Sequence, residues 1–267
     1  MGQHHYHGQT SSVTSSHASD PSTYGRSFAD VYDHWYANSF DTDGAVDSLS
    51  RLASAGPVLE LGVGTGRLAL PLAKTGLRVV GLDASPEMLS KLQVADSNSS
   101  VIPVLGDMAD IENSLSDAEI ADSFSLIICA FNTLLNLGGF DALTQCLRGS
   151  RERLLPHGRV VIEAFVPIDQ SAIPAISLTP ARVASDAAVF IETTFNAMTS
   201  QLHGRHIEVH PGSVVVRPWS VLICGTNELD SAAKTAGLVL TERFSDWIGS
   251  PFTDESAAHV SIYAPTE

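Results

Sequence analysis

Three glycines alternate with other residues in the segment VLELGVGTGRLALPLA, residues 58 to 73, which joins a short apolar run to a leucine-rich helical pattern. Glycine at such a junction lets the backbone turn sharply and brings main-chain N–H groups up to a ligand. A dinucleotide fingerprint requires the spacing G-x-G-x-x-G, whereas this segment has Gly62, Gly64 and Gly66, with Arg67 in the place of the last glycine. Glu60 adds a carboxylate at the mouth of the loop, which would repel a pyrophosphate and attract a cationic ligand.

A second carboxylate, Asp83, ends the next apolar run, 17 residues beyond Gly66. In open α/β sheets, ligands bind outside the carboxyl ends of the strands, so Asp83 should point into the same crevice and accept two hydrogen bonds from a ribose diol. A nucleoside that carries a ribose and a positive charge but lacks phosphates suits both carboxylates. S-adenosylmethionine has this composition, so we expect it as the cofactor.

Alternating strand and helix signals place these residues in a parallel sheet. Strands are predicted at residues 57–62, 78–83, 101–107, 124–131 and 158–165, with helices around 68–74, 86–93 and 140–155 between them. The pattern returns with a helix over 227–236 and strands at 238–244 and 259–264. We therefore predict an α/β fold, with a doubly wound core at residues 57–166 and 225–267 and an inserted antiparallel β segment at 167–224.

The N-terminal region divides into a polar tail and an aromatic segment. Residues 1–20 hold four histidines and five serines but little that could be buried, so we expect a disordered, tag-like tail rather than a metal site. The following region, residues 21–56, is predicted to contain two short helices. Five aromatic residues follow three-and-four spacing there and should share one helical face, which could pack against the sheet: Tyr24, Phe28, Tyr32, Trp35 and Tyr36.

The motifs LELGVGTGRLALPLA, GLDASPEML, GDM and FNTLLNL, in this order, resemble those of the class I S-adenosylmethionine-dependent methyltransferases over about residues 30 to 165, with a weaker echo in FSDWIGSPF. The resemblance implies a Rossmann-like sheet of seven strands, mostly parallel, whose final strand runs antiparallel. It also implies that the aromatic N-terminal segment lies over the cofactor as a lid.

The same resemblance implies roles for residues at matching positions. Those expected around the methionine part of the cofactor are Glu60, Gly62, Gly64 and Gly66, with Arg67 next in the loop; Asp83 is expected on the ribose, with Ala84 and Met88 beside it; Asp107 and Met108 are expected at the adenine; and Phe131 and Asn132 are expected where cofactor and acceptor meet.

The chemistry of methyl transfer narrows the choice of acceptor. The acceptor lone pair must lie in line with the methyl–sulfur bond, and positioning alone can supply roughly 7 to 11 kcal/mol. An amine can lose its proton to water, whereas a hydroxyl needs a base or a metal, and the core motifs place no histidine at a strand end. We therefore predict transfer to the amine of a small molecule without a metal. Tyr24, Tyr32 and Phe131 are the predicted catalytic residues, because their ring faces could lie against the sulfonium or the developing ammonium.

On the acceptor side, VYDHWY and the size of the insertion resemble small-molecule N-methyltransferases of antibiotic biosynthesis, which act on aminosugars or lincosamides. Transfer to oxygen is the alternative within the family. Two alternatives come from other classes. A nicotinamide-dependent oxidoreductase should carry a glycine at position 67 and lack Glu60, and a noncatalytic S-adenosylmethionine-binding protein should have a filled acceptor pocket.

Composition limits the partners. The formal net charge of −15 opposes binding to nucleic acid, and neither a membrane-length apolar run nor a secretory pattern occurs, so we expect a cytoplasmic chain with no nucleic-acid or membrane partner. The three cysteines are typical of buried thiols rather than of disulfides.

In HGRHIEVH, His206, Glu208 and His210 would share one strand face, which we interpret as the polar face of the insertion or a subunit contact rather than a metal site. The insertion could cover the substrate, form a homo-oligomer interface or do both.

Overall fold

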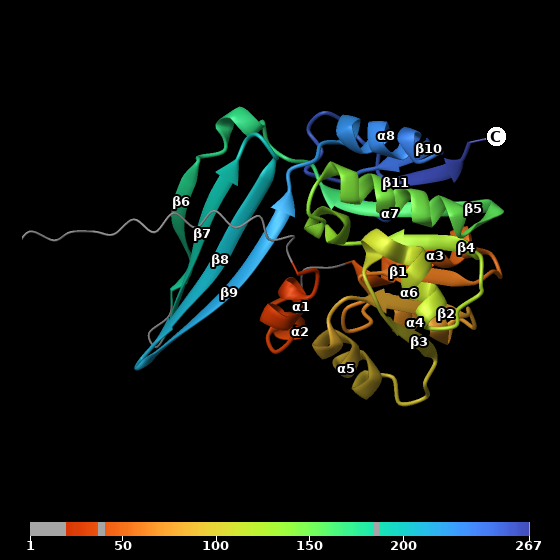
Figure 1. The fold of residues 1–267 in the computed structure, drawn as a ribbon, viewed down its shortest axis with the longest axis horizontal. Coiled ribbons are helices and arrows are strands. Elements are labelled where there is room, and N and C mark those ends of the chain that lie inside the picture. The colour runs from red at the N-terminus through yellow and green to blue at the C-terminus, as the bar shows by residue number, and fades with distance from the viewer. Residues whose placement is uncertain (1–19, 37–40, 184–186, 267) are drawn as a thin grey trace, which may run out of the picture.

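The computed structural model describes residues 20–36, 41–183 and 187–266, so the predicted disordered tail lies outside the described residues apart from Asp20. Its core is a seven-stranded sheet that stands beside a separate four-stranded sheet (Figure 1). The elements of the core after the N-terminal region are β1 (Val58–Leu61), α4 (Ala69–Lys74), β2 (Val79–Asp83), α5 (Pro86–Ala95), β3 (Val101–Leu105), η1 (Met108–Asp110), α6 (Ile111–Asp117), β4 (Phe124–Cys129), η2 (Thr133–Asn136), α7 (Phe140–Glu152), β5 (Leu154–Phe165), α8 (Thr226–Thr235), β10 (Leu238–Phe244) and β11 (Ala258–Pro265).

The strands of the core follow the order β10-β11-β5-β4-β1-β2-β3. The strands from β1 to β5 pair in parallel, whereas β11 runs antiparallel to both of its neighbours, β5 and β10. This confirms the predicted sheet of seven strands with an antiparallel final strand. Because β1 to β4 are parallel and adjacent, their carboxyl ends meet at one edge of the sheet, where ligands bind in open α/β folds.

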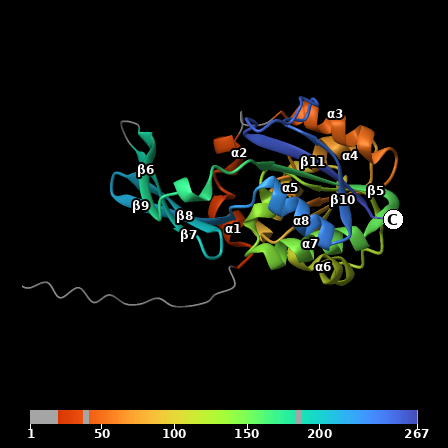
Figure 2. The same ribbon diagram turned by 90° about the horizontal axis from the view of Figure 1, so that it is seen from above.

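Helices cover both faces of this sheet (Figure 2). Leu115, Leu147 and Ala233 bring α6, α7 and α8 into one buried apolar cluster. Leu49 and Leu72 belong to the cluster on the opposite face, which is covered by α3 (Thr42–Ala53), α4 and α5. Burial of apolar side chains on both faces explains why the strands read as nearly continuous hydrophobic runs.

The segment between β5 and α8 forms the predicted antiparallel insertion. After η3 (Gln170–Ala172), the strands β6 (Ile176–Val183), β7 (Ala188–Asn196), β8 (Gln201–His210) and β9 (Ser213–Leu222) pair in chain order. In Figure 1 this sheet stands beside the core, and α1 (Thr23–Phe28) and α2 (Tyr32–Tyr36) lie between the two. The insertion therefore faces the ligand-binding edge of the core across the N-terminal helices.

The N-terminal region differs from its prediction in two respects. It holds three helices, α1, α2 and α3, rather than two, because the chain turns at residues 29–31. The aromatic side chains pack against both the insertion and the core: the rings of Phe28 and Trp35 lie 5.3 and 5.5 Å from the ring of His206, whereas the Tyr36 ring lies 5.4 Å from that of Phe131. The turn has a physical cause, since it lets Asp30 and the Ser27 carbonyl oxygen accept hydrogen bonds from Arg217 of β9.

The three cysteines are free and buried, as predicted. Burial raises the pKa of Cys146 and of Cys224 to about 12, so both thiols stay protonated near neutral pH. In the described part of the chain, no helix has both the length and the apolar character needed to cross a membrane.

Candidate active site

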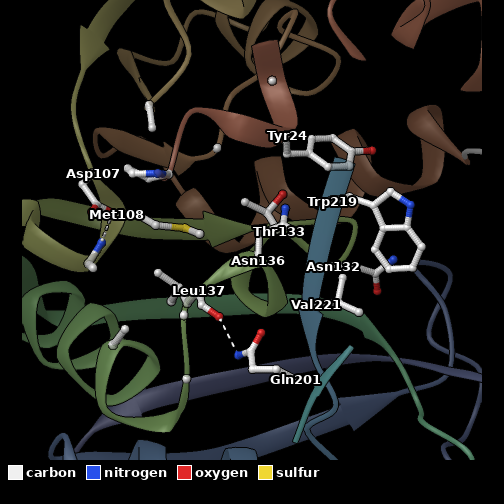
Figure 3. A pocket seen from close by; sticks show the side chains of 18 of the residues that line it. Tyr24, Asp107, Met108, Asn132, Thr133, Asn136, Leu137, Gln201, Trp219 and Val221 are labelled. Carbon is white, nitrogen blue, oxygen red and sulfur yellow. Dashed lines mark hydrogen bonds between the residues drawn. The ribbon is translucent and has the colours of Figure 1, made fainter. Parts of the chain in front are cut away.

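A cavity of about 1090 Å³ opens at the carboxyl edge of the core sheet, between the core, α1 and the inserted sheet (Figure 3). Most of the predicted site residues line it: Tyr24, Tyr32, Gly62, Gly64, Asp83, Ala84, Met88, Asp107, Met108, Phe131 and Asn132. Three others, Glu60, Gly66 and Arg67, are not among the lining residues. The structure thus gathers side chains from four strand ends and two N-terminal helices around one space.

The glycine loop turns as the sequence predicts, and the surroundings of its three glycines differ. All three lie at positive φ, which side chains rarely tolerate. A Cβ on Gly62 would meet the Thr133 side chain at 2.2 Å, whereas the same position on Gly64 faces open space. A Cβ on Gly66 would strike Leu92 of α5, so this glycine serves packing rather than the cavity wall.

Asp83, at the end of β2, anchors this loop and also lines the cavity. One carboxylate oxygen accepts the Gly64 N–H and the other accepts the Ser85 N–H, each at 2.8 Å. Each oxygen keeps a further lone pair for a ligand hydroxyl. Burial raises the pKa of Asp83, while the two backbone hydrogen bonds act in the opposite direction.

Glu60 is buried beside the loop rather than placed at its mouth, with 5% of its surface exposed. Burial raises its pKa to about 8, although Arg67 and the Ala69 N–H favour the charged form. Among the described residues, its Oε2 atom has no hydrogen-bond partner. A cation bound nearby would stabilise the ionised form of this carboxylate.

Asp107 and Met108 follow β3 and line another side of the cavity. The Asp107 carboxylate accepts the Ala109 N–H at 2.9 Å, which caps η1. Its backbone N–H donates to the Ser114 hydroxyl at 3.0 Å, so the turn after β3 is held from both sides.

The turn after β4 places two successive non-glycine residues in the left-handed region, Phe131 at φ +47° and Asn132 at φ +64°. Glu163 of β5 holds this turn. Its Oε2 accepts the Phe131 N–H at 2.8 Å, and its backbone oxygen accepts the Asn132 N–H at 3.0 Å. Trp247 donates to the other carboxylate oxygen at 2.7 Å. The cost of such a conformation, about 1–3 kcal/mol per residue, is offset by these contacts.

Glu163 was not predicted as a site residue. The signal that could have identified it is a lone acidic residue inside the apolar run VVIEAF, since a carboxylate in a buried strand requires partners.

Tyr24 and Tyr32 stand on the lid side of the cavity with their hydroxyls protonated. Burial raises the pKa of both phenols well above the usual range. The Tyr24 hydroxyl lies 3.5 Å from that of Tyr36, and the Tyr36 ring lies 5.4 Å from the Phe131 ring. The result is an aromatic wall that offers ring faces and no anionic oxygen.

The inserted sheet supplies a further wall, which is one of the two roles that the sequence left open for it, although its lining residues were not predicted. Gln201, His203, His206, Trp219 and Val221 all line the cavity. The Trp219 Nε1–H donates to Nδ1 of His206 at 3.0 Å, and burial lowers the pKa of this imidazole. His206 is therefore neutral near pH 7, with its hydrogen on Nε2.

The acidic residue of the HGRHIEVH segment of β8 forms an ion pair within the protein. Glu208 forms a buried ion pair with Arg217, which also binds Asp30 at 2.6 Å. In residues 20–36, 41–183 and 187–266, no group of three or more His, Cys, Asp or Glu side chains could hold a metal ion. The segment ties the inserted sheet to the turn between α1 and α2.

Comparison with known proteins agrees with this geometry. The family model described as "Methyltransferase domain" matches residues 58–158. The chain is 26% identical to the cypemycin N-terminal methyltransferase of a Streptomyces species over 248 residues, which cover 89% of this chain and 96% of that protein.

Solved structures resemble most of the chain. The CcbJ methyltransferase from Streptomyces caelestis is 34% identical and superposes with a TM-score of 0.83, covering 93% of this chain and 100% of the other. CalS10 from Micromonospora echinaspora, an amino pentose methyltransferase whose structure holds S-adenosylmethionine, shares the fold at 18% identity and a TM-score of 0.64, with 88% of this chain and 97% of the other covered.

The residues present fit S-adenosylmethionine. Gly64 leaves open space beside the loop, Asp83 keeps free lone pairs on the cavity wall, and Glu60 is a buried carboxylate with an unpaired oxygen that a cation would satisfy. A dinucleotide would instead bring a pyrophosphate towards these two carboxylates. The chain belongs to the class I S-adenosylmethionine-dependent methyltransferases.

Proposed function

We propose that this methyltransferase acts on an amine nitrogen of a small-molecule natural product of the lincosamide or aminosugar type. The observation that carries the proposal is the character of the acceptor side of the cavity, where rings line the wall and burial keeps the Tyr24 and Tyr32 hydroxyls protonated. Such a wall suits a neutral amine, which needs no base from the protein. The cypemycin N-terminal methyltransferase also supports nitrogen as the acceptor.

The proposed cofactor contacts follow from the cavity wall. When bound, S-adenosylmethionine supplies a methyl group on a positively charged sulfur. We place its ribose on Asp83, with Ala84 and Met88 beside it, and its adenine at Asp107 and Met108. Gly62 and Gly64 bring the loop backbone up to the methionine part, while Glu60 and Arg67, with Gly66, support the loop from outside the cavity.

The transfer itself requires positioning more than proton chemistry. The nitrogen lone pair forms the new N–C bond as the C–S bond breaks with its electrons remaining on sulfur, and the ammonium then loses its proton to water. Phe131 and Asn132, fixed by Glu163, hold the acceptor against the lid tyrosines. Orientation of this kind can supply roughly 7 to 11 kcal/mol.

Transfer to oxygen is the second candidate, and the two imidazoles on the inserted sheet favour it. A hydroxyl acceptor needs a base. The Nδ1 atom of His206 already accepts the Trp219 N–H, so its remaining ring hydrogen can only donate. His203 is then the candidate base for this alternative, and a His203→Gln variant separates the two functions.

The test uses a ¹³C-methyl donor with a panel of secondary amines, aminosugars and the corresponding alcohols. We expect N–CH₃ resonances in the products, a rate that rises with pH towards the acceptor's own pKa, and turnover that EDTA and His203→Gln leave unchanged. Products with O–CH₃ resonances, or turnover lost with EDTA or His203→Gln, would contradict transfer to nitrogen.

A further inference from the structure

Gln201 is a buried polar side chain that the proposed methyl transfer does not use. It is the first residue of β8, has 6% of its surface exposed and lines the main cavity. A buried amide costs free energy unless both of its ends find partners. Its Oε1 atom is not among the fully buried polar atoms that lack a partner, so this end of the amide faces the space of the cavity.

The orientation of this amide is settled by its neighbour. Its nitrogen donates to the backbone oxygen of Leu137 at 3.3 Å. A carbonyl oxygen can only accept, so the end of the amide nearest Leu137 must be the NH₂ group and the opposite end must be Oε1. Figure 3 shows this oxygen pointing away from Leu137 and into the space among the labelled residues. In the described part of the chain, no hydrogen bond reaches it.

The backbone around Gln201 is firmly seated where the insertion joins the core. Gln201 pairs with Leu222, which is fully buried, and the Ile223 N–H donates to the Ser200 oxygen at 2.8 Å. Gln170 joins the same junction, since its NH₂ group donates to the Ile223 oxygen and its own oxygen accepts the Ser200 hydroxyl, both at 3.2 Å. A side chain on such a junction is held in a fixed place, as a recognition group requires.

We infer that Oε1 of Gln201 accepts a hydrogen bond from an N–H or O–H group of the methyl acceptor. This inference rests on the proposed function, because it assigns a second recognition point to the same substrate. In Figure 3, Gln201 and Tyr24 lie apart around the cavity, and we place the group that Gln201 binds away from the reacting nitrogen. The acceptor class is thereby narrowed to amines that also carry a hydrogen-bond donor, such as an amide or a hydroxyl.

Selectivity arises because the bound acceptor displaces the water that would otherwise donate a hydrogen bond to Oε1 of Gln201. An acceptor with the donor pairs with Oε1, whereas an acceptor without it leaves a buried carbonyl oxygen unpaired. The discrimination should appear mainly in KM, because Gln201 binds substrate and transition state equally.

The experiment compares L-prolinamide, which has an amide N–H, with N,N-dimethyl-L-prolinamide, which has the same ring amine but no such donor. We measure kcat/KM for each amide. Calorimetry gives the Kd of each amide for the enzyme saturated with S-adenosylhomocysteine, and the Kd of S-adenosylhomocysteine itself. In the wild type we expect about a tenfold preference for prolinamide. In Gln201→Met, we expect the preference to fall to near one, with the affinity for S-adenosylhomocysteine unchanged.

Gln170→Met is the matched control, because it removes a glutamine-to-carbonyl hydrogen bond at the same junction but does not line the cavity. It should keep the tenfold preference. The inference is overturned if Gln201→Met keeps the preference, if both variants lose it equally, or if the wild type binds the two amides equally or binds neither. If the wild type binds prolinamide tenfold better but methylates neither, the inference stands and the proposed transfer to nitrogen fails.

Discussion

The two carboxylates beside the glycine loop have different environments. Both oxygens of Asp83 accept backbone hydrogen bonds, which favour its ionised form. Glu60 is almost completely buried with an unpaired oxygen, and burial raises its pKa to about 8. The raised pKa therefore favours the protonated form of Glu60. A bound sulfonium would favour release of the proton.

The first prediction concerns this proton. The unfolded chain releases it near the ordinary pKa of 4.5, whereas the folded protein keeps it until about pH 8. Stability should therefore fall as pH rises through this window, by on the order of 2 kcal/mol between pH 5.5 and 7.5. Glu60→Gln cannot titrate, so its free energy of unfolding should fall less over the same interval. Urea denaturation at both pH values measures the difference, and equal pH dependence in the two proteins would count against the assignment.

The second prediction concerns the lid tyrosines. Because burial keeps their hydroxyls protonated, Tyr24→Phe and Tyr32→Phe should each retain partial activity. Replacement by alanine removes a ring face worth about 0.5 to 2 kcal/mol towards a cation and should reduce kcat further. Steady-state kinetics on one amine compares the four variants. Complete loss of turnover in either phenylalanine variant would indicate an obligatory hydroxyl.

At the scale of elements, the turn between β4 and η2 depends on a side chain from the neighbouring strand. Glu163→Ala removes the acceptor of the Phe131 N–H, a charged hydrogen bond worth about 1.5–3 kcal/mol. We expect at least a tenfold fall in kcat, because the Phe131 backbone loses the carboxylate that fixes it, whereas the Asn132 amide keeps its hydrogen bond from the Phe165 N–H. Trp247→Phe is the control, since it removes the hydrogen bond to the other oxygen and part of a buried ring but leaves the acceptor of the Phe131 N–H in place. A Glu163→Ala protein with the kcat of the wild type would show that the turn does not need this side chain.

The lid is a second element with a testable role. α1 and α2 contribute residues to the wall of the cavity between the core and the inserted sheet, and we propose that they move when the cofactor enters or leaves. Hydrogen exchange over residues 23–36 should slow when S-adenosylhomocysteine is added, while exchange in α8 should stay the same. Unchanged protection of residues 23–36 would remove them from the exchange step.

Periodicity and turn chemistry predicted the core elements well. They did not predict features whose conformation depends on contacts between residues far apart in the chain. The strand-and-helix alternation indicated the doubly wound sheet, and GVGTG indicated a tight turn. The break between α1 and α2 was missed because its cause, the contact of Asp30 with Arg217, joins residues far apart in the chain. For the same reason, the sequence could not reveal that Gln201 and Trp219 of the insertion complete the cavity wall.

At the scale of the whole molecule, the cavity belongs to three parts of the chain at once. The core supplies the strand ends, α1 and α2 supply the aromatic wall, and the inserted sheet supplies the remaining wall. Arg217 links the last two parts through Asp30 and Glu208. The cavity is open rather than filled, as a methyltransferase that admits a second substrate requires. We therefore propose that the core recognises the cofactor and that its additions recognise the acceptor.

Calorimetry of S-adenosylhomocysteine binding tests most directly whether the crevice at β1 and β2 holds the cofactor, with Asp83 on its ribose. Asp83→Ala should weaken binding by on the order of 1 to 3 kcal/mol, because buried ribose hydroxyls lose their partner. Asp96→Ala is the control, since Asp96 also accepts a backbone N–H, that of Val101 at 2.7 Å, but does not line the cavity. Its Kd should match that of the wild type. A folded Asp83→Ala protein with an unchanged Kd would contradict this placement of the cofactor.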